Sequence, residues 1–143
     1  MDPAFWDTSA LVPLCLRHKP TPLLQRLSVT YDVVVWWATS VEARSAFARD
    51  VRAGVLTPAE HELAVGRLEE LKAGWREIQP SEALRGLAES MVERYSLRAA
   101  DALQLAAAYA WSLSQPFDKF LISGDKRLLE AAREAGFRVI QTS

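Results

Sequence analysis

Short apolar runs alternate with longer segments that carry helix signals along the chain. The clearest run, Asp32–Trp36, is rich in β-branched residues and is typical of a strand buried on both faces. Weaker runs lie at 4–6, 77–79, 120–122 and 137–140. Strands that alternate with helices predict an α/β protein with a mainly parallel sheet. Right-handed crossovers favour a doubly wound, five-stranded sheet, and the expected strand order is 3-2-1-4-5.

Helix start and stop residues separate these runs. Thr57–Glu60 combines a threonine cap, a proline at the first position and a capping-box glutamate, which predicts a helix reaching about Trp75. Ser96 is expected to cap the helix that carries Asp101. Pro13 is expected in the first turn of its helix, where a missing N–H costs least. The other helices are predicted at 9–17, 21–28, 39–53, 81–95 and 125–135.

Composition limits the class of protein. At 143 residues the chain suits one domain, spanning residues 1–143. The net charge of −1 gives no global attraction to nucleic acid, so such binding needs a local patch. Cys15 is the single cysteine, which excludes an internal disulfide and fits a reducing compartment such as the cytoplasm. Two histidines and one cysteine disfavour a zinc site, and no run reaches the roughly 20 apolar residues of a membrane helix.

Four acidic residues lie at predicted helix starts or within an apolar stretch: Asp7, Glu42, Asp101 and Asp125. Asp101 is the sharpest case, because no other charge lies between Arg98 and Asp118. A carboxylate on so apolar a helix costs free energy unless it is paired, hydrogen-bonded or metal-bound. Asp7 follows the first strand and Asp125 the fourth, and ligands of such folds bind where these neighbouring strands end. The sequence therefore predicts a site for hard divalent cations.

Each acid also has a simpler interpretation. Asp7 and Asp125 can be helix N-caps, and Thr39–Glu42 has the form of a capping box. Asp101 can pair with a basic residue one turn earlier. Capping does not exclude function, because a helix start beside a strand end is where such folds place ligands. One shared pocket is a simpler account than four separate coincidences.

Basic and aromatic residues offer weaker signals. Arg44, Arg98 and Lys126 lie within three residues of the acids and are candidates for phosphate binding or plain surface charges. The tryptophans are expected to be core or dimer contacts rather than platforms for stacked bases.

Four segments resemble, in order, the motifs of PIN-domain ribonucleases, most closely those of the VapC toxins of prokaryotic toxin–antitoxin pairs: Phe5–Leu11, Ser40–Arg44, Leu97–Ala106 and Leu121–Leu128. The resemblance spans nearly the whole chain and implies a Rossmann-like α/β/α domain. It also implies an RNA endonuclease that uses Mg²⁺ or Mn²⁺. Gly124 departs from the pattern, since many members carry a bulkier residue there, and it is expected to loosen the last turn.

The resemblance maps the family's conserved acids onto Asp7, Glu42, Asp101 and Asp125, and its fourth-motif hydroxyl onto Ser123. Asp7 and Asp101 are expected to be the main metal ligands, with Asp125 completing the site. Glu42 is expected to hold a metal-bound water or a second ion, and Ser123 a water or a phosphate. The RNA-binding candidates are Thr8, Arg44, Arg98 and Lys126. Clustered carboxylates repel one another, so raised pKa values are expected without metal.

The resemblance further implies a homodimer and a small antitoxin protein whose tail enters the acidic groove. Two alternatives stay open: a stand-alone RNA-processing nuclease and a catalytically silent module that keeps the fold for partner contact. A receiver-like signalling domain is disfavoured, because Asp7 has no acidic neighbour and no aspartate ends the run Glu77–Gln79.

Overall fold

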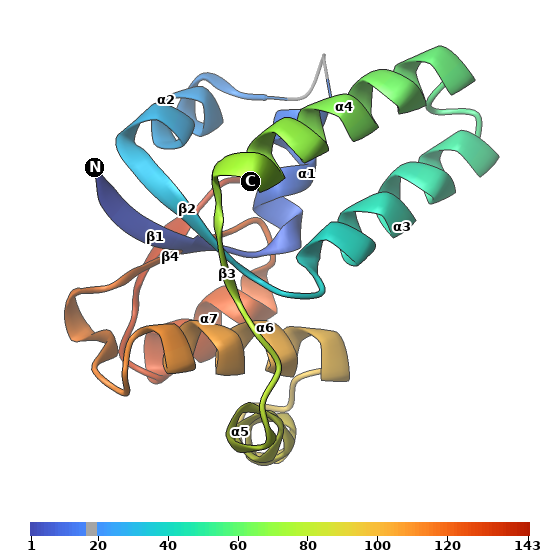
Figure 1. Cartoon of the computed structure of the whole chain (residues 1–143). Helices are drawn as coiled ribbons and strands as arrows, with labels where there is room; N and C mark the ends of the chain where they lie inside the picture. The colour runs from blue at the N-terminus through green and yellow to red at the C-terminus, as the bar shows by residue number, and fades with distance from the viewer. Residues whose placement is uncertain (17–19) are drawn as a thin grey trace.

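The protein is described by a computed structural model that covers residues 1–16 and 20–143, shown in Figure 1. Five strands form one sheet in the order β3-β2-β1-β4-β5, and every neighbouring pair is parallel. The strands are β1 (Asp2–Trp6), β2 (Tyr31–Trp36), β3 (Arg76–Ile78), β4 (Phe120–Ser123) and β5 (Arg138–Gln141). The predicted α/β class and strand order are confirmed.

Helices fill every connection between strands. They are α1 (Thr8–Cys15), α2 (Pro22–Thr30), α3 (Thr39–Arg52), α4 (Pro58–Gly74), α5 (Glu82–Arg94), α6 (Ala99–Trp111), a 3-10 helix (Pro116–Asp118) and α7 (Lys126–Glu134). The predicted end of the first helix, at Arg17, lies outside the described residues. Among the helices described, none has the length and hydropathy needed to cross a membrane.

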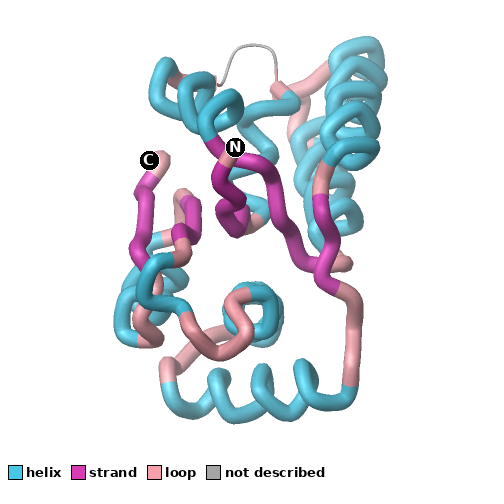
Figure 2. Tube along the Cα trace, turned by 60° about the vertical axis from the view of Figure 1, so that its left-hand side comes forward, coloured by secondary structure: helices cyan, strands magenta, loops and turns pink. Residues whose placement is uncertain are grey.

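The sheet is buried on both faces, because alternate side chains along each strand enter different helical layers. Phe5 and Leu121 pack with residues of α5, α6 and α7. Trp6 and Ile122 pack on the opposite face with α1 and α2. Figures 1 and 2 show α6 between the sheet and α5, which lies outermost. Burial on both faces explains why the strands read as continuous apolar runs.

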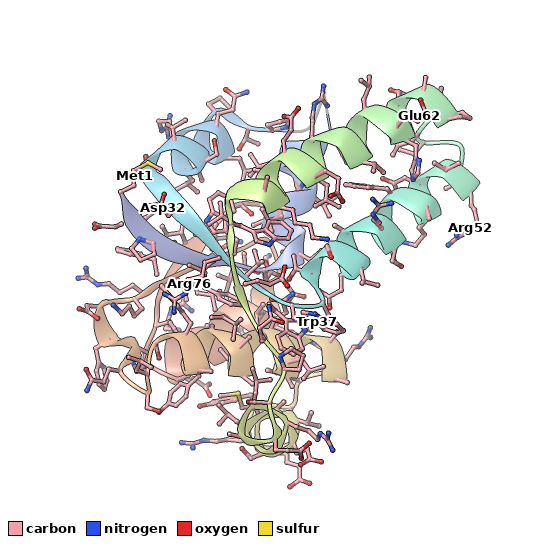
Figure 3. All side chains as sticks on the ribbon, in the orientation of Figure 1. Met1, Asp32, Trp37, Arg52, Glu62 and Arg76 are labelled. Carbon is pink, nitrogen blue, oxygen red and sulfur yellow. The ribbon has the colours of Figure 1, made fainter. Side chains whose placement is uncertain are left out.

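Helices α3 and α4 form a hairpin that projects from the sheet in Figure 1, and Figure 3 labels Arg52 and Glu62 at its far end. The predicted capping box is present at the start of α4. The Glu60 N–H donates to Thr57 Oγ1 at 3.1 Å, and the Thr57 N–H donates to Glu60 Oε1 at 2.9 Å. Phe47 of α3 and Leu68 of α4 are fully buried in a cluster shared with α1. The hairpin is therefore anchored to α1.

Two predicted helix caps are wrong. Ser96 has a φ of 55°, the left-handed conformation that ends helices, so it lies just beyond the end of α5. Arg98 takes the N-cap position of α6. Thr39–Glu42 is no capping box, because α3 already includes Thr39 and Ala38 stands at its N-cap without a side-chain bond.

The position predicted for Pro13 is also wrong. Helix α1 begins at Thr8, so Pro13 lies in its interior, close to the end at Cys15. A proline there leaves the carbonyl of the preceding turn without its usual donor. The helix stops shortly afterwards, with the Leu16 N–H bonded to the Pro13 carbonyl at 3.4 Å. Pro13 therefore accompanies the end of α1 rather than its start.

Candidate functional site

A cleft of about 840 Å³ lies at the edge where β1 and β4 end, between α1, α3 and the start of α6. Residues from all four predicted acidic positions line it: Asp7, Glu42, Asp101 and Asp125. Asp7 follows β1, Asp125 follows β4, and the other two lie in the first turns of α3 and α6. The neighbouring positions of β1 and β4 in the sheet explain how residues so far apart in sequence reach one cleft.

Asp7 is the most buried of the four, with 4% of its surface exposed. The Ser9 hydroxyl donates to its carboxylate, at 2.8 Å from Oδ1 and 3.0 Å from Oδ2. Asp7 stands at the N-cap position of α1, yet its side chain makes no cap hydrogen bond. The simple capping interpretation therefore does not account for this carboxylate.

The described residues offer little positive charge to balance a negative charge on the Asp7 carboxylate. The pKa of Asp7 is raised to about 7, chiefly by burial and to a smaller extent by the nearby charge of Asp125. The hydrogen bonds of Ser9 and Ser123 act in the opposite direction. Within the described residues, no basic side chain forms an ion pair with Asp7. A buried carboxylate without a cationic partner is a candidate for an added cation.

Asp125 does cap its helix. Its Oδ1 accepts hydrogen bonds from the backbone N–H groups of Arg127 at 2.9 Å and Leu128 at 3.2 Å. Ser123 is fully buried at the end of β4, and its Oγ accepts from the Asp125 N–H at 2.9 Å. Oδ2 of Asp125 makes no hydrogen bond to any described residue. Capping thus uses one oxygen and leaves the other available to the cleft.

Gly124 is held on both sides rather than loosened. Its N–H donates to Ser9 Oγ at 2.8 Å, and its carbonyl accepts from Ser143 Oγ at 2.9 Å. A Cβ at this position would lie 3.2 Å from Thr142 Oγ1 and 3.3 Å from Ser143 Oγ. A Cβ here would therefore require these two hydroxyls to shift by a few tenths of an ångström, and the turn that carries Asp125 is fixed by hydrogen bonds.

Glu42 is held by side chains across the cleft. Its Oε1 accepts a short hydrogen bond from the Thr8 hydroxyl and one of 2.7 Å from Gln104 Nε2. Gln104 Nε2 also lies 3.1 Å from Thr8 Oγ1 and 3.2 Å from Thr39 Oγ1. Thr8, predicted to contact RNA, here contacts Glu42.

Asp101 is half-buried and makes no hydrogen bond to the described residues. Burial raises its pKa, and the charges of Asp125 and Glu42 raise it further, while Arg98 and Arg127 oppose the shift. No ion pair joins Asp101 to Arg98 in the described part of the chain. The electrostatic influence of the other acids is consistent with one shared cleft.

The predicted basic residues divide into two groups. Arg98 lines the cleft, whereas Arg44 and Lys126 do not. Arg44 is exposed on α3, and its Nη2 is 3.2 Å from Glu69 Oε1 of α4. Lys126 is exposed at the start of α7.

Five polar or charged residues of the cleft were not predicted as part of the site: Ser9, Ser45, Arg49, Asp50 and Gln104. Two of them had a usable signal in helical spacing. Arg49 lies two turns after Glu42 on α3, and Gln104 lies one turn after Asp101 on α6. Each therefore shares a helix face with an acid. The only sequence signal for Ser9 was its position two residues after Asp7.

The donor chemistry of the cleft fits a hard cation. Its possible ligands are carboxylate oxygens, and no histidine or cysteine is among the described residues that line it. As the side chains stand, no three His, Cys, Asp or Glu residues in the described ranges are grouped closely enough to hold a metal ion. The Ser9 hydroxyl holds the Asp7 carboxylate and the start of α7 holds one oxygen of Asp125. Binding an ion would require the side chains of Asp7, Asp101 and Asp125 to turn inward.

No protein-family model matches the chain, and no curated protein matches it by sequence. Its fold is nevertheless similar to that of solved structures. A chain of FitAB bound to an IR36 DNA fragment is 18% identical, with 96% of this chain and 94% of that chain covered and a TM-score of 0.69. FitAcB from Neisseria gonorrhoeae is 18% identical, with 96% of both chains covered and a TM-score of 0.68.

A toxin–antitoxin complex from Klebsiella pneumoniae is a third similar structure. It is 15% identical, with 85% of this chain and 86% of that chain covered and a TM-score of 0.59. At these identities the likeness concerns the fold. Together with the strand order, it shows that this chain shares the α/β fold of these structures, as the sequence predicted.

Proposed function

We propose that this protein is a metal-dependent endoribonuclease. The observation that carries the proposal is the convergence of the four predicted carboxylates on one cleft, which Asp50 of α3 also lines. The most buried of the four, Asp7, has no cationic partner among the described residues. Such burial costs free energy, and a divalent cation bound in the cleft would offset that cost.

Mg²⁺ or Mn²⁺ would be held by carboxylate oxygens of Asp7, Asp101 and Asp125. Such an ion, when bound, lowers the pKa of water and stabilises the charge on a phosphodiester. Glu42 keeps Oε2 free of hydrogen bonds to the described residues, so this atom can accept a hydrogen bond from the attacking water. The chain thus offers direct ligands and a separate oxygen that orients water.

Basic side chains would bring the RNA backbone to these acids. Arg98 lies beside Asp101 at the start of α6, and Arg49 lines the same cleft farther along α3. A guanidinium group can bind two phosphate oxygens at once, which counters the repulsion between an acidic cleft and a polyanion. The two arginines therefore define the direction in which we expect the strand to run, from α6 along α3.

We further propose that the nuclease is the toxin of a toxin–antitoxin pair. Support comes from the similarity in fold to the Klebsiella pneumoniae complex and from the shape of the cleft. The cleft also runs between α1 and α3, where Val12, Leu16 and Ala46 line it together with Ser45, Arg49 and Asp50. A groove that combines apolar side chains with carboxylates suits a protein tail with apolar residues and an arginine.

A homodimer is part of the same proposal. Trp37 is 48% exposed at the end of β2, as labelled in Figure 3. It borders an apolar pocket of about 610 Å³ that is also lined by Trp36, Leu84 and Leu103. An exposed apolar area of this kind is typical of interfaces.

The nuclease proposal is tested with purified protein, a fluorescent RNA and the matching DNA. We expect cleavage of the RNA with Mn²⁺, none after EDTA treatment, and none by Asp101→Asn. The matched control is Asp32→Asn, an exposed residue at the other end of β2 in Figure 3, which should cleave like the wild type. Cleavage that persists in EDTA, or in Asp101→Asn at the wild-type rate, contradicts the assignment.

The antitoxin proposal is tested by co-expression with the small open reading frame that adjoins the gene. We expect its product to co-purify with the chain and to restore growth of cells in which the chain is toxic. If it does neither, a stand-alone RNA-processing nuclease becomes the better account.

A further inference from the structure

Gln104 is a buried polar residue of the cleft whose amide is only partly satisfied. It is 2% exposed and lies on α6, one turn after Asp101. Its Nε2 lies 2.7 Å from Glu42 Oε1, and the hydroxyls of Thr8 and Thr39 are 3.1 and 3.2 Å away. Its Oε1 is buried without a hydrogen-bond partner among the described residues. All the hydrogen-bond contacts of this amide to described residues are therefore made by its nitrogen, Nε2.

The orientation of the amide is set by Glu42. If the amide were flipped, its oxygen would lie 2.7 Å from a carboxylate oxygen, and the two acceptors would repel each other. In the observed orientation the amide donates to Glu42 and leaves its own oxygen unpaired. A buried unpaired acceptor costs free energy, so the donation to a charged group must outweigh that cost.

The result is a carboxylate with two unlike oxygens. Oε1 of Glu42 accepts from both Thr8 and Gln104, whereas Oε2 has no partner among the described residues. Thr39, which is fully buried beside the amide, limits the positions that the Gln104 side chain can take. One oxygen is anchored and the other stays open to a ligand of the cleft.

We propose that Gln104 is a positioning residue that fixes the Glu42 carboxylate through Nε2 and so keeps Oε2 directed at the cation site. The proposal rests on the proposed function, because the ligand in question is the divalent cation with its water. An ordinary structural role for Gln104 does not explain why its amide leaves an acceptor unpaired while it contacts residues of the cleft.

The test replaces Gln104 with methionine, which has a similar length and no donor. Gln104→Met should fold like the wild type, because it fills the same space and removes the unpaired oxygen. Its affinity for Mn²⁺, measured calorimetrically without RNA, should fall about 10- to 100-fold, as is usual when a residue that orients a metal ligand is lost. Gln25→Leu, an exposed glutamine of α2, is the matched control and should bind Mn²⁺ like the wild type.

A double-mutant cycle with Glu42→Ala shows whether Gln104 acts through Glu42. In the Glu42→Ala background, Gln104→Met should weaken Mn²⁺ binding no further. An equal loss in both backgrounds would mean that Gln104 acts through general packing, and this overturns the proposal. Wild-type Mn²⁺ affinity in Gln104→Met overturns it as well.

The same four proteins separate a failure of this inference from a failure of the proposed function. If the wild type itself binds no Mn²⁺, the proposed function fails, and the melting temperatures without metal decide whether Gln104 holds Glu42. The sum of the melting-temperature shifts of the two single variants should then differ from the shift of the double variant by about 3 °C, because residues in direct contact are energetically coupled. Additive shifts overturn the positioning role.

Discussion

At the scale of single residues, burial distinguishes Asp7 from an ordinary helix cap. The folded protein holds a proton on Asp7 up to a pH of about 7, whereas the unfolded chain releases it near 3.8. Since the folded pKa is raised, this contribution to stability is fully present below pH 3.8 and is lost as the pH rises through 7. The shift corresponds to about 4 kcal/mol of unfolding free energy.

Asp7→Asn should therefore stabilise the metal-free protein at pH 8 and change its stability much less near pH 4. We expect a gain of about 2–4 kcal/mol at pH 8, reduced from the full shift by the altered bond to Ser9. Thermal unfolding in EDTA between pH 4 and pH 8 measures the difference, with Asp32→Asn as the control. A difference that does not vary with pH contradicts the assigned cause.

Single residues also show which parts of the site can be predicted from the sequence. Arg49 and Gln104 can be predicted from helical spacing, because each shares a helix face with an acid. Nothing in the sequence distinguishes Arg98, which lines the cleft, from Arg44, which pairs with Glu69 on another helix. Side-chain direction at an exposed position depends on neighbours that are distant in sequence.

At the scale of elements, capping patterns in the sequence predicted the helix starts that depend on hydrogen bonds within one turn. Thr57 and Glu60 bond to each other within one turn, so the pattern and the structure agree. Ser96 follows the same cap rule in sequence, yet its backbone has the left-handed conformation that ends α5. The rule fails there because an N-cap residue needs an extended backbone, which Arg98 has and Ser96 lacks.

Thr57→Ala should lower the unfolding free energy by about 1 kcal/mol, because the first turn of α4 loses its side-chain acceptor. Urea denaturation measures this loss. RNA cleavage at a temperature well below unfolding should not change, since Thr57 does not line the cleft. An unchanged urea midpoint would mean that the cap contributes nothing to the stability of the hairpin.

At the scale of the whole molecule, the strand order could be predicted because few arrangements satisfy short, right-handed crossovers. That order brings the ends of β1 and β4 together, and so it brings Asp7 and Asp125 to one edge. Topology therefore places the acids in a shared cleft, while it leaves open the network through which Gln104 contacts Glu42.

The proposed dimer also belongs to this scale. We expect light scattering to give twice the mass of the chain for the wild type and the mass of one chain for Trp37→Glu. Trp37 is 48% exposed, so the added charge should leave the fold intact, and circular dichroism checks this. A wild-type protein that stays monomeric at high concentration contradicts the dimer.

The central claim is that the acidic cleft binds a divalent cation, and the effect of Mn²⁺ on the melting temperature tests it most directly. A ligand that binds the folded state alone adds about 2.7 kcal/mol at 100 times its dissociation constant. Saturating Mn²⁺ should therefore raise the melting temperature of the wild type and of Asp32→Asn by several degrees. It should leave that of Asp101→Asn nearly unchanged. No rise in the wild type, or an equal rise in Asp101→Asn, would contradict the claim.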